Sequence, residues 1–204
     1  MKILGISGHK GAGKTTVAEW LEGVKNAHEC NNAHSIGFFT LAKDRYVDTM
    51  EREYLILDDQ DVKDSVHPSG KTRRQMMQEY GCALRAIWPD VWVENWKNFA
   101  VCHPAITHLI APDVRFPNEV KAIHDLGGHV IRLTRTPFPE DKHESETALD
   151  KCELATIACI AAKNMGKTLY SGVGLFDYVI DNANMTVDEC NKAVLELVTE
   201  KGWV

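Results

Sequence analysis

A glycine-rich segment near the start of the chain constrains the fold more than any other feature of the sequence. Residues 8–15 read GHKGAGKT and match the pattern G-x-x-x-x-G-K-[ST]. The apolar run from Lys2 to Ser7 is typical of a buried parallel strand, and an amphipathic helix is predicted from Lys14 to about Lys25. Because strand, loop and helix follow one another in the order that the pattern requires, the sequence predicts a phosphate-binding loop in an α/β fold.

Each residue type in this loop has a chemical reason. Glycines let the backbone turn so that successive N–H groups point at phosphate oxygens, and the helix presents its positive end to the same anion. Lys14 would offset charge on the β- and γ-phosphates, and the Thr15 hydroxyl would be a ligand of Mg²⁺. The residues expected to bind ATP here are His9, Lys10, Gly11, Ala12, Gly13, Lys14, Thr15 and Thr16.

The rest of the chain predicts short strands that alternate with helices. Strands are expected at 35–39, 107–111, 129–134 and 178–181. Helices are expected at 41–52, 72–87 and 91–99, between the first and second of these strands, and at 117–126, between the second and third. Further helices are expected at 149–164 and after a capping box at 186–189, and polar loops at 58–70 and 136–146. This alternation favours a three-layer α/β fold, a parallel sheet with helices on both faces.

Composition and charge exclude several classes of function. Lys and Arg total 23 against 29 Asp and Glu, a net charge of −6, which disfavours non-specific binding to nucleic acid or to an anionic membrane. No stretch approaches the roughly 18 apolar residues of a membrane span, and the first apolar run is too short for a signal peptide. The six cysteines form no C-x-x-C pair and are expected to be free thiols. We therefore expect a cytoplasmic protein (in the host cytoplasm if it is viral) with neither nucleic acid nor membrane as partner.

Two charged residues follow the predicted strand at 107–111. Asp113 can orient Mg²⁺-bound water or accept a proton from an incoming phosphate, and Arg115 can clamp an anionic acceptor with its planar fork. Arg132 and Arg73 are as well explained by solvated surface positions as by phosphate binding. The guanine-reading tetrad N-K-x-D does not occur, which disfavours a GTPase.

Four further motifs carry a resemblance to a known family. Residues 74–81 read RQMMQEYG, similar to R-x-L-L-Q-x-x-G; 113–119 read DVRFPNE, matching D-V-R-F-x-N-E; 143–146 read HESE, matching H-x-S-E; and 177–182 read DYVIDN, like the family's last strand. Together with the phosphate loop these resemble the deoxynucleoside monophosphate kinases of bacteriophages, within the P-loop nucleoside monophosphate kinase superfamily, over most of the chain. One departure is at 39–43, FTLAK, where the family's A-D-x-L-K-like segment has an acid.

The resemblance implies transfer of the ATP γ-phosphoryl group to a deoxynucleoside 5′-monophosphate by a single P-loop kinase domain over 1–204. It implies a helical acceptor-binding region at about 41–102 and a lid at about 135–150. The implied catalytic residues are Lys14, Asp113 and Arg135, and Asn182 would lie near the ATP base. The implied substrate-binding residues are Lys43, Arg74, Gln78, Arg85, Trp92, Arg115 and Glu146. The expected partners are ATP with Mg²⁺ and the monophosphate, and a homodimer stays open.

Two other functions remain alternatives at this point. Another small P-loop kinase, such as a dephospho-coenzyme A or phosphomevalonate kinase, would share the loop and the D-x-R strand end. A nucleotide-binding regulatory module with little or no kinase activity would not need a second arginine-rich anionic site. Production of ADP that depends on an acceptor distinguishes a kinase from such a module.

Overall fold

The structure, a computed structural model, describes residues 1–29, 33–38, 59–138, 143–164 and 176–203, and side chains are described for most of these. The chain divides into two units. The first comprises Met1–Gly37 together with Ala100–Val204, and the second comprises Phe38–Phe99. The second unit is therefore an insertion in the sequence of the first.

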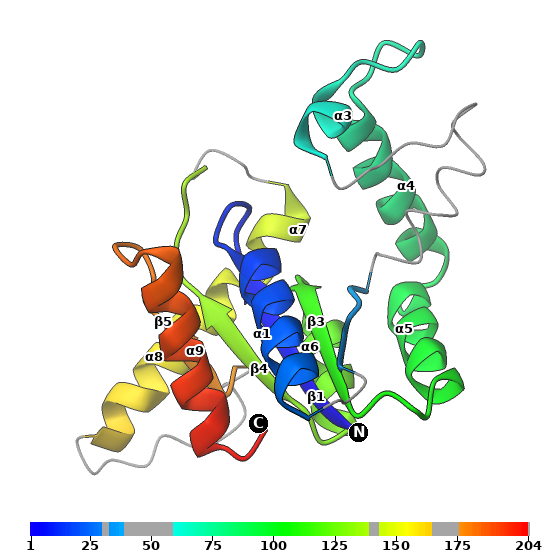
Figure 1. Cartoon of the computed structure of the whole chain (residues 1–204). Helices are drawn as coiled ribbons and strands as arrows, with labels where there is room; N and C mark the ends of the chain where they lie inside the picture. Colours follow the sequence, from blue (N-terminus) through cyan, green and yellow to red (C-terminus); the bar gives the residue numbers. More distant parts are fainter. Residues whose placement is uncertain (30–32, 39–58, 139–142, 165–175, 204) are drawn as a thin grey trace. The chain divides into compact units, whose positions relative to one another are not determined.

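A parallel sheet lies at the centre of the first unit (Figure 1). Its strands are β1 (Lys2–Gly8), β2 (Ala33–Ser35), β3 (His108–Val114), β4 (His129–Leu133) and β5 (Tyr178–Ile180). Their order across the sheet is β2-β3-β1-β4-β5, so β1 is central and pairs with β3 and β4. Because all pairs are parallel, the carboxyl ends of the strands meet at one edge, where ligands of such sheets bind.

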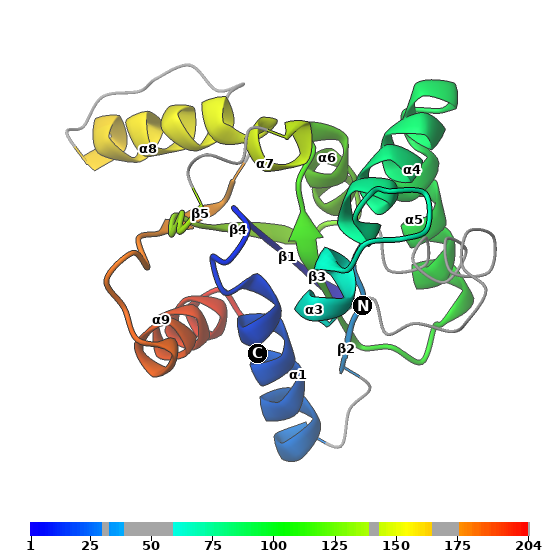
Figure 2. The same ribbon diagram turned by 90° about the horizontal axis from the view of Figure 1, so that it is seen from above.

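Helices cover both faces of this sheet, as Figure 2 shows. On one face lie α1 (Lys14–Glu29) and α9 (Val187–Glu200), and on the other lie α6 (Pro117–Asp125) and α8 (Asp150–Asn164). The core between the sheet and the first pair of helices includes Leu4, Ile6, Val17, Leu21, Ile131, Leu133 and Val194, all almost fully buried. The predicted three-layer α/β fold is confirmed.

The second unit is helical in its described part. It contains α3 (Gln60–Asp64), α4 (Arg73–Ile87) and most of α5 (Val91–Cys102), which ends in the first unit. Thr72 caps α4 as predicted: its hydroxyl accepts a hydrogen bond from the Gln75 N–H, and the Gln75 side chain accepts one from the Thr72 N–H. The rings of Phe38 and Trp96 lie 4.7 Å apart between centroids within this unit.

Strand β3 departs from its predicted course. The sequence predicted a break at Pro112, but the strand continues to Val114. The pairing of β1 with β3 shifts register between Gly5 and Ser7, which pair with Ala111 and Val114, so Pro112 lies in a β-bulge. A proline is tolerated there because the ladder does not need its missing N–H. The bulge carries the strand past Asp113 and brings that residue to the sheet edge.

Two short helices lie in segments predicted as loops. The helix α3 falls within 58–70, where the Asp59 carboxylate accepts hydrogen bonds from the N–H groups of Asp61 and Val62. The helix α7 (Glu144–Thr147) falls within and just beyond 136–146, and the Nδ1 atom of His143 accepts from the Ser145 N–H. Both segments are polar, but the side chains of Asp59 and His143 accept hydrogen bonds from the first N–H groups of the helices and so stabilise the helix starts. The helix predicted at 41–52 lies outside the described residues.

No helix in the described part of the chain is both long and apolar enough to cross a membrane.

Candidate phosphate-binding site

The GHKGAGKT loop joins the carboxyl end of the central strand β1 to the first turn of α1. Gly11 and Gly13 have φ values of +76° and +95°, in the left-handed region that favours glycine. A Cβ atom on Gly11 would also lie 2.6 Å from Cγ of Pro137, so the chain after β4 packs directly on the loop. Glycine is therefore required at position 11 both by the turn and by this close approach.

Lys14 is buried beneath this loop. Its ammonium donates hydrogen bonds to the carbonyl oxygens of Gly8 and His9, each at 2.8 Å. Burial, followed by the positive charges of Arg115 and Arg132, lowers the pKa of Lys14 well below its usual range, and Asp113 opposes this shift. Among the described residues no carboxylate contacts the ammonium directly, so this position suits an anionic ligand.

Asp113 lies at the sheet edge beside the backbone that follows β2. A Cβ atom on Gly37 would lie 2.4 Å from Oδ2 of Asp113, so the carboxylate sits directly over that glycine. Thr15 is exposed in the first turn of α1. In the described residues no group of three or more His, Cys, Asp and Glu could hold a metal ion. A hydroxyl and one carboxylate do suit Mg²⁺, which takes its other ligands from phosphates and water.

Glu146, on α7, connects the loop to Arg115. Its Oε2 atom accepts a hydrogen bond of 2.6 Å from the backbone N–H of Lys10, and its Oε1 atom accepts one from Nη1 of Arg115. The same Nη1 atom donates to the Ser145 carbonyl at 3.2 Å. The Glu146 side chain is 5% exposed. The predicted substrate residues Arg115 and Glu146 thus meet each other at the phosphate loop.

Glu119 fixes the backbone from which Arg115 projects. Its Oε2 atom accepts hydrogen bonds from the N–H groups of Arg115, at 2.7 Å, and Phe116, at 3.1 Å. This carboxylate is buried at the start of α6. Sequence reasoning did not assign it a role, although a glutamate at the third position of a helix that begins with proline can accept from the N–H before the helix, as in one half of a capping box.

Asn182 and Arg135 also join the loop, through backbone contacts. The Asn182 Nδ2 atom donates to the Ala12 carbonyl at 2.8 Å, and its Oδ1 atom accepts from the Arg135 N–H at 2.9 Å. The Arg135 guanidinium donates to the Met185 carbonyl. Asn182 is 1% exposed, so its side chain braces the loop against the segment that follows β5. The roles predicted for Asn182 and Arg135 toward ATP stay predictions.

A buried charge network lies beneath the loop, and sequence reasoning missed it. Arg132 is 2% exposed and donates to Glu153 at 2.6 Å, to Asp150 at 3.0 Å and to the Ser7 hydroxyl at 3.1 Å. Nε2 of His9 lies 3.0 Å from Oδ1 of the same Asp150. Burial, the largest cause, lowers the pKa of His9 although Asp150 opposes it.

The surface interpretation of Arg132 is wrong for a physical reason. A strand of a parallel sheet is covered on both faces, so a charged side chain within β4 has to find buried partners. The signal was available in the sequence, because residues 130–133 read VIRL and the arginine stands among apolar residues.

The other predicted acceptor residues lie in the second unit. Arg74, Gln78 and Arg85 are on α4, and Nε of Arg74 lies 2.8 Å from Oδ1 of Asp64. Trp92 is buried in α5, and its indole N–H donates to the Gly81 carbonyl at 3.3 Å. Lys43 lies outside the described residues. Their substrate roles stay predictions.

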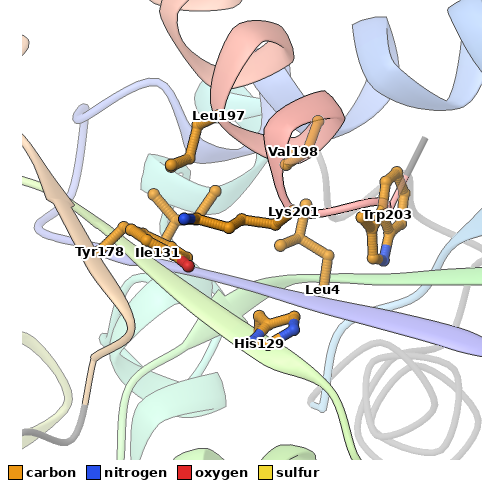
Figure 3. Close-up of a pocket in the computed structure, with 8 residues that line it drawn as sticks. All are labelled: Leu4, His129, Ile131, Tyr178, Leu197, Val198, Lys201 and Trp203. Atoms are coloured by element: carbon orange, nitrogen blue, oxygen red, sulfur yellow. The ribbon is translucent and has the colours of Figure 1, made fainter.

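A separate apolar cavity lies between α9 and the sheet (Figure 3). Leu4 and His129, which are register partners at the start of β4, line it, whereas the phosphate loop follows the strand ends. Its other lining residues are Ile131, Tyr178, Leu197, Val198, Lys201 and Trp203. This cavity is therefore not part of the phosphate site.

The parallel sheet, the glycine-rich loop after its central strand and the helix α1 define the P-loop α/β class of proteins. No protein-family model matches the chain. The chain is similar to a protein of Acanthamoeba polyphaga mimivirus named "Putative deoxynucleotide monophosphate kinase", with 26% identity over 178 residues that cover 81% of this chain and 91% of the relative.

Two solved structures are similar over nearly the whole chain. One is the Mycobacterium tuberculosis APS kinase CysC in complex with AMPPNP and APS, with 16% identity, 97% of both chains covered and a TM-score of 0.45. The other is an uncharacterized protein from Eubacterium ventriosum, with 12% identity, 98% of both chains covered and a TM-score of 0.40. These likenesses are too distant to bear on the function of this chain.

Proposed function

We propose that the protein is a nucleotide kinase that transfers the γ-phosphoryl group of ATP to a deoxynucleoside 5′-monophosphate. The observation that carries the proposal is the meeting of the phosphate loop with Arg115, which share the carboxylate of Glu146. A protein that only binds a nucleotide needs the loop, whereas phosphoryl transfer also needs a second cationic group beside it. The similarity to the mimivirus protein, which is named for the same activity, supports this substrate class.

The donor nucleotide would bind with its phosphates in the loop. The positive end of α1 begins at the loop, and Lys14 adds a buried positive charge. These groups are fixed before the reaction, so they stabilise the developing charge without reorganising. Catalysis in this class consists mainly of such positioning and charge stabilisation.

Mg²⁺ is proposed to accompany ATP. The Asp113 carboxylate, near the end of β3, and the Thr15 hydroxyl, in the first turn of α1, would hold it. When bound, the ion would neutralise part of the charge on the β- and γ-oxygens. Asp113 would also attract the proton of an incoming phosphate.

The acceptor is proposed to bind through residues of the helical segment. Arg74, Gln78 and Arg85 share α4, and arginine forks bind phosphate oxygens in pairs. The lid predicted at about 135–150 includes residues 139–142, which lie outside the described residues, and its role stays a prediction.

A coupled assay of ADP release tests the proposal. The protein is given ATP and Mg²⁺ with each common nucleoside and deoxynucleoside monophosphate in turn, and with dephospho-coenzyme A and phosphomevalonate. We expect ADP release that depends on a deoxynucleoside monophosphate and that Lys14→Ala abolishes. ADP release only with one of the other acceptors would replace the substrate class, and release independent of every acceptor would contradict a kinase.

A further inference from the structure

Glu146 joins two donors that a phosphate would also use. One is a backbone N–H of the phosphate loop, that of Lys10, and the other is the guanidinium of Arg115. Each donor takes a different oxygen of the same carboxylate. The carboxylate is almost fully buried, so it fills the space between them.

One phosphoryl group can take the place of that carboxylate. Carboxylate and phosphoryl oxygens accept the same charge-assisted hydrogen bonds, and an arginine fork fits either group. The two oxygens of a carboxylate are separated by nearly the same distance as two oxygens of one phosphoryl group. Donors that converge on one carboxylate therefore also converge on one phosphoryl group, and not on two phosphates of different molecules.

The position of Lys14 indicates which phosphoryl group this is. Its ammonium contacts the carbonyls of Gly8 and His9, the two residues before Lys10. The lysine of this motif reaches the β- and γ-phosphates, so the Lys10 N–H lies at the terminal-phosphate end of the loop. The charge of Arg115 also acts on the Lys14 ammonium and contributes to the lowered pKa of that lysine.

We propose that the Lys10 N–H and the Arg115 guanidinium form one binding site for the terminal phosphoryl group of the nucleoside triphosphate, and that Glu146 fills this site in the free protein. The proposal deepens the proposed function and rests on its donor half. It assigns Arg115 to the group in transfer, whereas the family resemblance implied the acceptor.

The charge of Glu146 then opposes binding of a triphosphate. A γ-phosphoryl group can use the two donors only when the carboxylate has left them, because like charges cannot share the site. A diphosphate does not reach this end of the loop and need not displace Glu146. The site therefore separates nucleotides by their number of phosphates.

Binding measurements on Glu146→Gln test this separation. Affinities for a non-hydrolysable ATP analogue and for ADP, both with Mg²⁺, are measured by titration calorimetry on the native protein and the variant. Glutamine keeps the shape but removes the charge, so we expect analogue affinity to rise about tenfold, the size of one charge-assisted hydrogen bond. The affinity for ADP should stay within about twofold, since that nucleotide does not meet residue 146.

Glu144→Gln is the matched control. Glu144 is exposed on the same turn of α7, so its substitution removes the same charge two residues away. It should change neither affinity by more than about twofold. If the affinity for the analogue rose equally in both variants, the rise would come from the lower net negative charge and not from the position of Glu146, and the proposal would be overturned.

Arg115 supplies the second arm of the test. In the Glu146→Gln background, Arg115→Met should cancel the gain for the analogue and leave ADP binding unchanged. Arg115→Lys keeps the charge but loses the fork, so it should retain part of the gain, and it replaces the methionine variant if that one does not fold. Equal changes for ADP and the analogue would overturn the proposal.

The two proposals can fail separately. If the affinities split as expected but no monophosphate is phosphorylated, the kinase proposal fails and the phosphoryl site stands. If the protein phosphorylates a monophosphate but Glu146→Gln changes both affinities alike or lowers that of the analogue, the kinase stands and the phosphoryl site is overturned. Absence of nucleotide binding would overturn both.

Discussion

At the scale of single residues, Lys14 contacts the backbone of the loop to which it belongs. The Lys14 ammonium bridges the Gly8 and His9 carbonyls across the loop. Burial and two nearby arginines hold its pKa well below the usual range, so the folded protein disfavours the positive charge. The residue is therefore better explained by ligand binding than by folding.

Lys14→Ala should abolish phosphoryl transfer and leave the protein folded. The substitution removes the charge that faces the β- and γ-phosphates, and we expect kcat to fall by about 10²-fold or more, the loss typical of one fixed stabilising group. Steady-state kinetics and circular dichroism measure the two effects. Lys121→Ala, at an exposed position on α6, is the control and should keep the native rate. A Lys14 variant with near-native kcat would contradict the assignment of the loop.

Residue types in the loop could be predicted from the sequence, and their partners could not. The pattern at 8–15 defines a loop because its glycines and lysine act locally. Glu146 reaches Lys10, and Asn182 reaches Ala12, across more than one hundred residues of chain. Such pairs depend on the tertiary arrangement of strands, which no local pattern encodes.

At the scale of elements, ion pairs connect α8 to the sheet. Arg132 in β4 holds Asp150 and Glu153 in the first turn of α8, and it also reaches the Ser7 hydroxyl at the end of β1. The contact therefore orders one helix and two strands at the point where the phosphate loop begins.

Arg132→Met should destabilise the protein strongly. The substitution removes charge-assisted hydrogen bonds from Glu153 and from Asp150, which is 41% exposed, and such losses cost about 1.5–3 kcal/mol in the free energy of unfolding. Urea unfolding measures it. Lys192→Met removes one side of an exposed pair with Glu196 on α9 and should cost no more than about 1 kcal/mol. Equal effects of the two substitutions would show that the Arg132 network does not stabilise the fold.

The capping box of α9 predicts a smaller effect. The Thr186 hydroxyl accepts from the Glu189 N–H at 3.3 Å, and the Glu189 carboxylate accepts from the Thr186 N–H at 2.8 Å. Thr186→Ala should lower the free energy of unfolding by about 1 kcal/mol, measured by urea unfolding. Thr186→Ser keeps the hydroxyl and should stay close to the native value. If the serine variant were as unstable as the alanine variant, the loss of stability would not come from the capping hydrogen bond.

Elements were predictable where local chemistry decides them. The boxes at Thr72 and Thr186 mark helix starts because both partners lie within four residues of each other. The course of β3 past Pro112 was not predictable, because a bulge depends on pairing with β1. The helix α3 was missed because Asp59 caps a segment whose polarity alone favours a loop.

At the scale of the whole molecule, acid stability should depend on Asp177. This residue precedes β5, and its carboxylate accepts from the Val130 N–H at 2.7 Å and lies 2.9 Å from His124 and 3.3 Å from His129. Burial raises its pKa, but the hydrogen bonds from Val130, His124 and His129 outweigh burial, and the pKa is lowered overall. The folded state therefore favours the ionised carboxylate.

The sign of the pH dependence follows from this lowered pKa. The stabilisation is present above the ordinary aspartate value of about 4 and is lost as pH falls through the folded-state value. Asp177→Asn should reduce the free energy of unfolding at pH 7 by about 1.5–3 kcal/mol, the contribution of hydrogen bonds to a charged group. Urea unfolding of both proteins as a function of pH measures the difference, which should shrink in acid. A difference that is constant with pH would contradict the role of the charge.

The strand order has a consequence for how the chain acquires its structure during synthesis. The central strand β1 is made before its partners β3 and β4, with which it pairs across more than one hundred residues of chain. Until these arrive, an apolar strand stays unpaired in the nascent polypeptide, which is the kind of segment that aggregates or recruits chaperones. The second unit, Phe38–Phe99, is complete in sequence before β3 emerges. The second unit is therefore synthesised before the strands of the sheet can pair with one another. Because this pairing joins distant parts of the chain, it should limit the rate of folding.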